Sequence, residues 1–156
     1  MKIGLISDTH SFIDENVFLH FKECDEIWHA GDIGDIKLLH RLQKFKPTKA
    51  VFGNIDGLEF RNDTEENLHF NCEGLSVWMT HIGGYPPRYV PKVLTQLKQK
   101  TPDIFICGHS HILRVMHDKQ FERPLLYINP GAAGKHGFHH VRTVLRFEIN
   151  NSKVEN

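Results

Sequence analysis

Side chains that bind metals occur in five short clusters of this sequence, and each cluster directly follows an apolar segment. The clusters are Asp8-Thr9-His10, Gly31-Asp32, Gly53-Asn54, Thr80-His81 and Gly108-His109-Ser110-His111. Carboxylate, amide and imidazole donors without a thiolate suit divalent transition metals, and this set is large enough for two ions. The first chemistry to consider is therefore that of a metal centre with oxygen and nitrogen ligands.

The apolar segments before these clusters are typical of short strands in a covered sheet. They span residues 2–7, 26–30, 49–52, 75–79 and 103–107. Short apolar runs bounded by turn residues favour buried strands. Because ligands of open α/β sheets bind at the carboxyl ends of the strands, five strands that end at such residues predict one shared site.

The rest of the chain predicts an α/β first half and a β-rich second half. Helices are expected at 14–23, 36–44 and 91–100, with Asp35 as the cap of the second. Glu73-Gly74 marks a hairpin turn. Further strands are expected at 68–72, 75–80, 112–117, 125–128 and 142–149. These parts assemble most naturally as a four-layer α/β/β/α sandwich of two mixed sheets flanked by helices.

Composition limits the class of protein. The 156 residues predict a single domain at 1–150, with a polar, frayed tail at 151–156. The 19 basic and 19 acidic residues balance, which argues against a sequence-specific nucleic-acid partner. No apolar run reaches the ~20 residues of a membrane helix, so no membrane partner is expected. The three cysteines form no C-x-x-C pair, which favours a cytoplasmic protein. The sequence leaves homo-oligomer formation open.

Each cluster taken singly has an ordinary structural explanation. Asp8 and His10 could be a turn aspartate and a surface histidine, and Gly-Asn and Gly-Asp pairs commonly form turns. His81 could be a hydrogen-bonded histidine at a strand end. The pair His109 and His111 is more specific, because two histidines two residues apart at a strand end are a common metal arrangement. Five such clusters at five strand ends are hard to reconcile with independent turns.

The order D-x-H, G-D, G-N, H and G-H-x-H resembles the signature of the calcineurin-like metallophosphoesterases. The resemblance spans residues 8–111, and Asn129-Pro130-Gly131 is similar to the N-P-G-S segment of the small bacterial and archaeal phosphodiesterase branch. That branch is related in fold to the retromer phosphoesterase-like subunit. The resemblance implies the same fold and a metal-dependent hydrolase of a small phosphoester substrate, most specifically a phosphodiesterase.

The resemblance also implies a role for each ligand residue. The first metal would be held by Asp8, His10, Asp32 and His111. The second would be held by Asp32, Asn54, His81 and His109, with Asp32 bridging. The same seven residues form the catalytic set, because a hydroxide shared by the two ions would attack phosphorus in line. Manganese is the first expectation for the metal, and iron, zinc or nickel would also suit these ligands.

One position departs from the family pattern. Many relatives carry a histidine directly after Gly-Asn, where it assists the leaving group, but here Ile55 follows. Isoleucine cannot exchange a proton, which leaves the proton donor open. Asp56 either supports a metal ligand or makes a turn, and His29 either orients a ligand or is an ordinary buried histidine. Arg88 either clamps a phosphate or is a surface charge.

Rival functions are separated by single residues. A haloacid dehalogenase-type phosphatase needs a second aspartate at position 10, where His10 stands, and a dinucleotide-dependent oxidoreductase needs a G-x-G-x-x-G that is absent after the first strand. The alternative that remains is a non-catalytic or weakly catalytic protein-interaction module of the same fold. Residues 135–140 contain three histidines, and we expect a solvated loop there rather than phosphate contacts.

Overall fold

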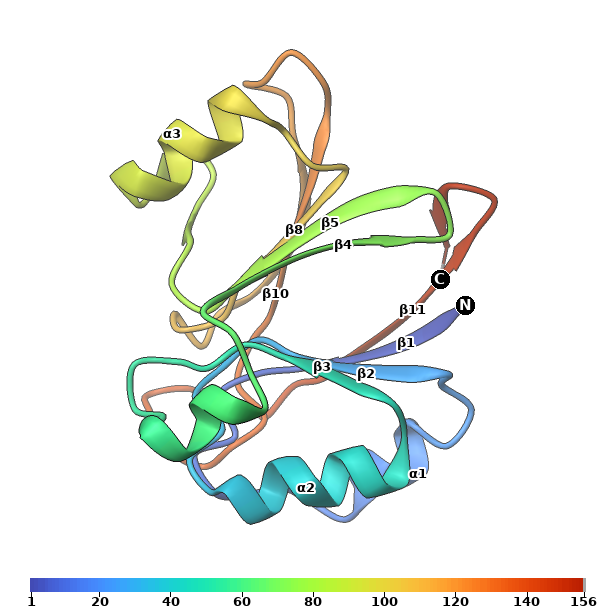
Figure 1. The fold of residues 1–156 in the computed structure, drawn as a ribbon, viewed down its shortest axis with the longest axis vertical. Coiled ribbons are helices and arrows are strands. Elements are labelled where there is room, and N and C mark those ends of the chain that lie inside the picture. The colour runs from blue at the N-terminus through green and yellow to red at the C-terminus, as the bar shows by residue number, and fades with distance from the viewer. Residues whose placement is uncertain (156) are drawn as a thin grey trace.

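Two five-stranded sheets pack face to face in the computed structural model, which describes residues 1–155 (Figure 1). The first sheet has the order β12-β11-β1-β2-β3. Its strands are β1 (Lys2–Ile6), β2 (Glu26–His29), β3 (Thr48–Ala50), β11 (Leu145–Asn150) and β12 (Lys153–Glu155). The second sheet has the order β4-β5-β8-β10-β9. Its strands are β4 (Asn67–Cys72), β5 (Leu75–Thr80), β8 (Ile104–Ile106), β9 (Leu113–Asp118) and β10 (Leu125–Pro130). Both sheets are mixed.

Helices cover the outer faces of the two sheets (Figure 1). The first sheet carries α1 (Asn16–His20) and α2 (Ile36–Phe45), and the second carries α3 (Pro91–Gln99). A 3₁₀ helix, η1 (Leu58–Asn62), lies between β3 and β4, and a small hairpin of β6 (Gly84–Tyr85) and β7 (Arg88–Tyr89) precedes α3. The predicted α/β/β/α sandwich is confirmed.

The apolar core forms three layers because each sheet is covered on both faces. In β8, Phe105 belongs to the apolar cluster under α3, while its neighbour Ile106 belongs to the cluster between the sheets, as Trp28 does. Successive strand residues point to opposite faces, so a strand buried on both sides must be apolar throughout. Leu39 of α2 belongs to the third layer of the core, which lies between the first sheet and its helices. Burial of such side chains stabilises the fold by about 1.5–3 kcal/mol each.

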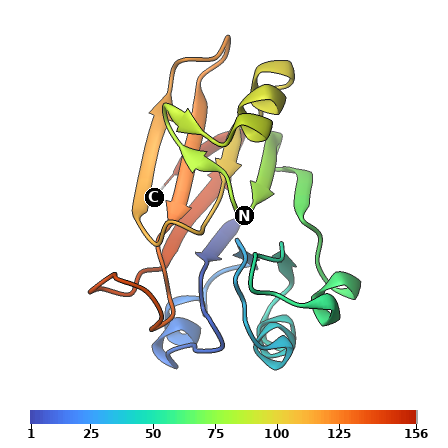
Figure 2. The ribbon, with the colours of Figure 1, turned by 90° about the vertical axis from the view of Figure 1, so that its left-hand side faces the viewer.

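The strands that precede the five clusters end at the same edge of the sandwich. β1, β2 and β3 are parallel neighbours in one sheet, and β5 and β8 are parallel neighbours in the other. In Figure 1 this edge lies on the left, at the opposite end from the chain termini, and Figure 2 looks directly at it. The topology therefore gathers all five clusters at one end of the interface between the sheets.

The structure settles three expectations about elements. The Asp35 cap of α2 is confirmed, since its carboxylate accepts a hydrogen bond from Lys37 N at 2.8 Å. The first helix is shorter than predicted and ends at His20. The frayed tail is wrong for residues 153–155, which pair with β11 as β12. A polar segment can do this because edge pairing uses backbone groups. Asn156 lies outside the described residues.

Candidate metal centre

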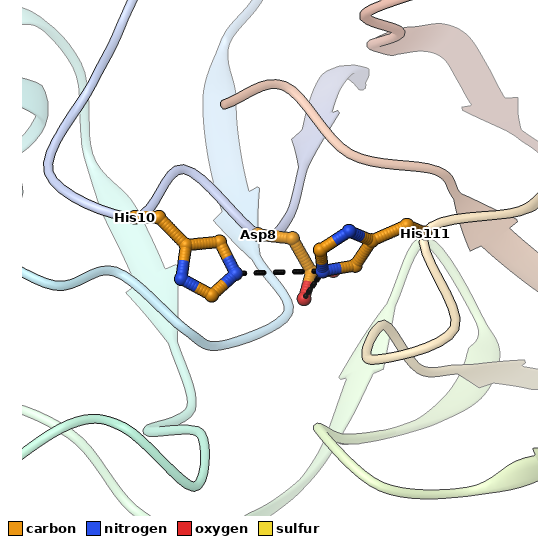
Figure 3. Close-up of side chains that lie close together, drawn as sticks. All are labelled: Asp8, His10 and His111. Atoms are coloured by element: carbon orange, nitrogen blue, oxygen red, sulfur yellow. Dashed lines mark hydrogen bonds and ion pairs between the residues drawn. The ribbon is translucent and has the colours of Figure 1, made fainter. Parts of the chain in front are cut away.

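Six of the seven predicted ligand residues form two adjacent groups. The donor atoms of Asp8, His10 and His111 lie within 4.8 Å of one another, and Figure 3 shows these three side chains pointing toward a common space. The second group, defined by the same separation, comprises Asp32, His81 and His109. The first group therefore joins the ends of β1 and β8, and the second joins those of β2, β5 and β8.

The two aspartates connect the two groups. His111 Nε2 lies 3.1 Å from Asp8 Oδ1, and His81 Nε2 lies 3.9 Å from the same oxygen. His10 Nε2 lies 3.6 Å from Asp32 Oδ2, and His81 Nε2 lies 3.2 Å from Asp32 Oδ1. Each carboxylate thus faces histidines of both groups, which is the arrangement that a pair of neighbouring cations would need.

The backbone at the site is unusual. Five of the predicted ligands have a positive φ, namely Asp8 (52°), His10 (45°), Asp32 (54°), His109 (67°) and His111 (58°). Only a few per cent of non-glycine residues adopt this conformation. Each such residue costs about 1–3 kcal/mol and persists only where the surrounding structure holds it, most often at functional sites.

Asp56 holds two of these loops together. Its carboxylate accepts hydrogen bonds from Ile33 N at 3.1 Å, Gly34 N at 2.8 Å and Gly53 N at 2.7 Å. It therefore fastens the loop after β2, which carries Asp32, to the loop after β3. Of the two sequence interpretations of Asp56, the structure favours support of the ligand loops.

His29 holds another pair of loops. Its Nδ1 accepts a hydrogen bond from Gly31 N at 3.1 Å, so its proton is on Nε2, which lies 3.0 Å from Thr9 Oγ1. The Thr9 hydroxyl in turn donates to Ile33 O at 3.0 Å. Burial disfavours the charged imidazole and lowers the pKa of His29 to about 4. A neutral His29 thus connects the segment between Asp8 and His10 to the segment around Asp32.

Asn129, which the sequence marked only through its Asn-Pro-Gly segment, fixes the loop after β8. Its Nδ2 donates to Gly108 O at 2.9 Å and to Ser110 Oγ at 3.1 Å, and its Oδ1 accepts from Gly131 N. Gly108 and Ser110 flank His109, so Asn129 sets the position of both histidines in this loop. The role depends on contacts between β10 and β8, which no local sequence pattern reveals.

Hydrogen bonds hold one side of each buried ligand and leave the other side open. Asp8 Oδ2 accepts from Ser7 Oγ at 2.6 Å and from His109 N at 3.1 Å. His81 Nδ1 donates to Ala30 O at 2.8 Å, which leaves the lone pair on Nε2. Asp8 Oδ1 and His81 Nε2 are buried and have no hydrogen-bond partner in residues 1–155. Buried polar atoms of this kind are rare, and a bound cation would satisfy both, so the residues fit a divalent metal.

The charges of the site act on one another. The Asp8 carboxylate raises the pKa of His111. Burial opposes protonation of His81, but Asp32 and Asp8 outweigh it and raise the pKa of this imidazole. At Asp32, burial is outweighed by His81 and by the Ile55 N–H, so the pKa of the carboxyl is lowered. For His10, burial outweighs both carboxylates and lowers the pKa. Carboxylates and imidazoles are therefore strongly coupled before any metal binds.

The remaining candidate residues differ in how close they lie to the two ligand groups. Asn54 is exposed next to Ile55, whose N–H donates to Asp32 Oδ1 at 3.2 Å, so its backbone adjoins the second group. Arg88 is exposed in β7 and makes no ion pair with either group within the described chain. Residues 135–140 are mostly exposed, as expected, and two histidine rings there also lie beside the first group.

Comparison with known proteins identifies the family. The model of the calcineurin-like phosphoesterase superfamily domain matches residues 1–152. The chain belongs to this superfamily. A probable metallophosphoesterase of Methanothermobacter thermautotrophicus is 31% identical over 139 residues, which cover 85% of this chain and 77% of that protein. A second, from Methanocaldococcus jannaschii, is 32% identical over 138 residues, covering 85% and 68%.

Solved structures of other proteins share the fold. Vps29 of Entamoeba histolytica complexed with Zn²⁺ aligns with a TM-score of 0.77 at 18% identity, over 99% of this chain and 89% of that one. An archaeal phosphodiesterase aligns with a TM-score of 0.76 at 21% identity, over 99% and 98%. The family is metal-dependent, and membership of it supports hydrolase activity for this chain. No helix in residues 1–155 has the length and apolar character needed to cross a membrane.

Proposed function

We propose that the protein is a phosphodiesterase that works with two divalent metal ions. Asp8, His10, Asp32 and His111 would hold the first ion. Asp32, Asn54, His81 and His109 would hold the second. The observation that carries the proposal is the position of Asp32, with one oxygen toward His10 and the other toward His81. When bound, such ions supply Lewis acidity, lower the pKa of water and offset the charge of a phosphoryl group.

The chain itself would orient and attract the substrate. Asp56, His29 and Asn129 keep the ligand loops in their strained conformations, so the site needs little reorganisation when a ligand binds. Two carboxylates against two divalent ions leave a local positive surplus, although the whole chain has no formal net charge. That surplus would draw a phosphate anion to the site.

Ile55 supports a diester with a good leaving group. Ile55 is 47% exposed, its N–H contacts Asp32 of the second group, and its side chain cannot give a proton to a departing oxygen. An aryl oxide leaves without a proton, whereas an alkoxide needs one. The proposed substrate is therefore an activated phosphodiester rather than an alkyl phosphomonoester.

We further propose manganese as the native metal, with iron, zinc and nickel as alternatives, because imidazole and carboxylate ligands suit all four. The three cysteines are free and buried, which supports a reducing compartment such as the cytoplasm.

The second candidate function is a protein-interaction module of the same fold. The similar TM-scores to Vps29 and to the archaeal phosphodiesterase favour neither function. The sequence contains a residue at every predicted ligand position, which supports the enzyme.

A phosphoester panel tests the proposal. The purified protein is stripped of metal, reloaded separately with each of the four metals, and assayed on aryl and alkyl diesters and monoesters. We expect hydrolysis of the aryl diester only after reloading, and its loss in Asp32→Ala. A protein that binds two metal equivalents tightly and hydrolyses none of the esters would instead support the interaction module.

A further inference from the structure

A glycine-rich loop is packed directly onto the first ligand group. We call residues 134–140 the histidine loop. Gly134 N donates to Asp8 O at 3.0 Å, and the preceding Ala133 N donates to Ser7 O at 3.0 Å. His139 closes the loop by a hydrogen bond of 2.8 Å between its Nε2 and Gly134 O. The loop is therefore attached to the same segment that carries the first predicted ligands.

Two glycines permit this close approach. A Cβ on Gly134 would lie 2.3 Å from Thr9 O, and a Cβ on Gly137 would lie 2.3 Å from His111 Nδ1. Gly137 also has a φ of 123°, which side chains rarely adopt. A loop that was merely solvated would need neither feature. Its glycines instead let the loop backbone pack closely against the residues of the first ligand group.

This close approach places one histidine ring of the loop beside His10. The ring centroid of His136 lies 4.8 Å from that of His10. His136 is exposed, and within residues 1–155 its ring nitrogens have no hydrogen-bond or ion-pair partner. His139 is half-buried and lies 5.3 Å from the His111 ring; its Nε2 is bonded within the loop, and its Nδ1 is buried without a partner in residues 1–155. His136 therefore has free hydrogen-bonding atoms beside the first group.

The surroundings of His136 favour an anion. Lys135 Nζ lies 4.1 Å from the Phe12 ring and pairs with no carboxylate in the described chain. Arg142 lies over the same ring at 5.3 Å but is neutralised by Asp14 at 3.1 Å. The loop itself contains no acidic residue. In Figure 2 it lies at the lower left, across the strand ends from η1, which follows Ile55. The loop packed on the first group thus carries one unpaired cation and one free imidazole.

We propose that His136 is a substrate-binding residue whose ring donates a hydrogen bond to an oxygen of the phosphoester, with Lys135 adding positive charge. The inference rests on the proposed function, since the phosphate must be held at the adjacent metal centre. It assigns to the histidine loop a polar contact with the substrate that the Ile55 side chain cannot make. The ligand class is a phosphate anion or its ester.

The test uses the whole protein loaded with manganese and inorganic phosphate as the probe. His136→Phe keeps a ring against His10 and removes both nitrogens, and His136→Gln restores an N–H donor. The matched control is His140→Phe, an exposed histidine at the end of the same loop. Calorimetry gives the dissociation constants of manganese and of phosphate for each protein, and KM and kcat are measured for an aryl diester.

We expect His136→Phe to weaken phosphate roughly three- to tenfold, the range of a single hydrogen bond, and to raise KM more than it lowers kcat. His136→Gln should recover part of the loss, and His140→Phe should match the wild type. Manganese affinity should change less than about twofold in all three variants, because none of them removes a predicted ligand.

Three results would overturn the inference. Equal phosphate affinity in wild type and His136→Phe would exclude the contact while leaving the proposed function intact. A manganese affinity that falls together with phosphate affinity would make His136 a metal ligand or a support for His10. A wild type that binds manganese but not phosphate would refute the contact, and the diester assay on the same sample then decides whether the proposed function falls with it.

Discussion

At the scale of single residues, Asp32 has the most demanding predicted role. Its two oxygens face His10 at 3.6 Å and His81 at 3.2 Å, so one carboxylate serves both ligand groups. We predict that Asp32→Ala removes both metal equivalents together, each with roughly a hundredfold or greater loss of affinity, because even groups that only support a ligand are worth 10–100-fold. Asn54→Ala should weaken mainly one equivalent. Metal content and calorimetry measure this, and two full equivalents in Asp32→Ala would refute the bridging role.

Ile55 makes a second prediction about single residues. General acid catalysis is worth typically 10²–10⁴-fold, so Ile55→His should accelerate alkyl diesters by tenfold or more while changing aryl diesters little. Ile82→His is the matched control, because Ile82 is also an exposed isoleucine directly after a predicted ligand. Rates for one alkyl and one aryl diester decide the matter. Equal gains on both substrates would mean that the absent proton donor does not limit this enzyme.

The sequence alone predicted which residue types form the site, but not the hydrogen-bond partners that hold those residues in place. Six of the seven predicted ligands lie together in the two groups, and the metal-binding roles of all seven stay predictions. The role of Asp56 stayed open because its three N–H partners come from two loops that the local sequence does not connect. The role of His29 stayed open for the same reason, since its hydrogen bonds reach Thr9 and Gly31, which lie in different loops.

At the scale of elements, the loops after β2 and β3 depend on a single carboxylate. Asp56→Ala leaves the N–H groups of Ile33, Gly34 and Gly53 without their acceptor, and each unsatisfied buried group costs about 1–3 kcal/mol. We predict a loss of several kcal/mol in the free energy of unfolding, with a smaller loss in Asp56→Asn, which keeps one oxygen. Urea denaturation of the metal-free protein measures it.

A surface aspartate provides the control for that experiment. Asp63 makes an exposed contact with His40 at 3.2 Å, so Asp63→Asn should change stability by less than about 0.5 kcal/mol. If Asp56→Ala were no worse than Asp63→Asn, the loops would be held by other contacts. Reduced metal affinity in Asp56→Ala should accompany its reduced stability, because the loop that carries Asp32 loses its attachment.

Elements were predictable where side-chain periodicity decides them and not where backbone contacts do. The two sheets, α2 and α3 follow from apolar spacing. The turn at Glu73 and Gly74 has positive φ at both residues, which is typical of a two-residue hairpin turn and which only Gly74 favours by its residue type. β12 escaped prediction because an edge strand pairs through backbone groups. The position of the histidine loop also could not be predicted. Its glycines are needed for the close approach to Thr9 and His111, which are far away in the sequence.

At the scale of the whole molecule, metal binding should appear as stability. A ligand at a hundredfold excess over its dissociation constant adds about 2.7 kcal/mol, which for a chain of this size is roughly 5–10 °C in Tm. The effect should shrink as the pH falls, because the raised pKa of His81 and of His111 lets protons compete with the metal at a higher pH than at ordinary histidines. Thermal scans with and without manganese from pH 8 to pH 5 measure this, and a pH-independent shift would contradict it.

The metal-free protein should lose stability in acid for a separate reason. His29 has its pKa lowered from 6.5 to about 4 by burial, and its Nδ1 must stay unprotonated to accept from Gly31 N. The unfolded chain therefore takes up this proton first, so the contribution of His29 is complete above pH 6.5 and is lost as the pH falls toward 4. The difference corresponds to on the order of 3 kcal/mol. The raised pKa of His81 and His111 acts in the opposite direction, stabilising the metal-free native state at low pH and losing that effect as pH rises.

A comparison with His29→Gln separates these contributions. The variant is less stable near neutral pH if it loses the bonds to Thr9 and Gly31, but its stability should fall less steeply between pH 6.5 and 4, because no imidazole remains to be protonated on unfolding. Urea denaturation of both metal-free proteins across that range gives the two slopes, and the contributions of His81 and His111 are common to both. Parallel slopes would mean that His29 takes up its proton in the folded protein, and that the contacts between the first two ligand loops survive its charging.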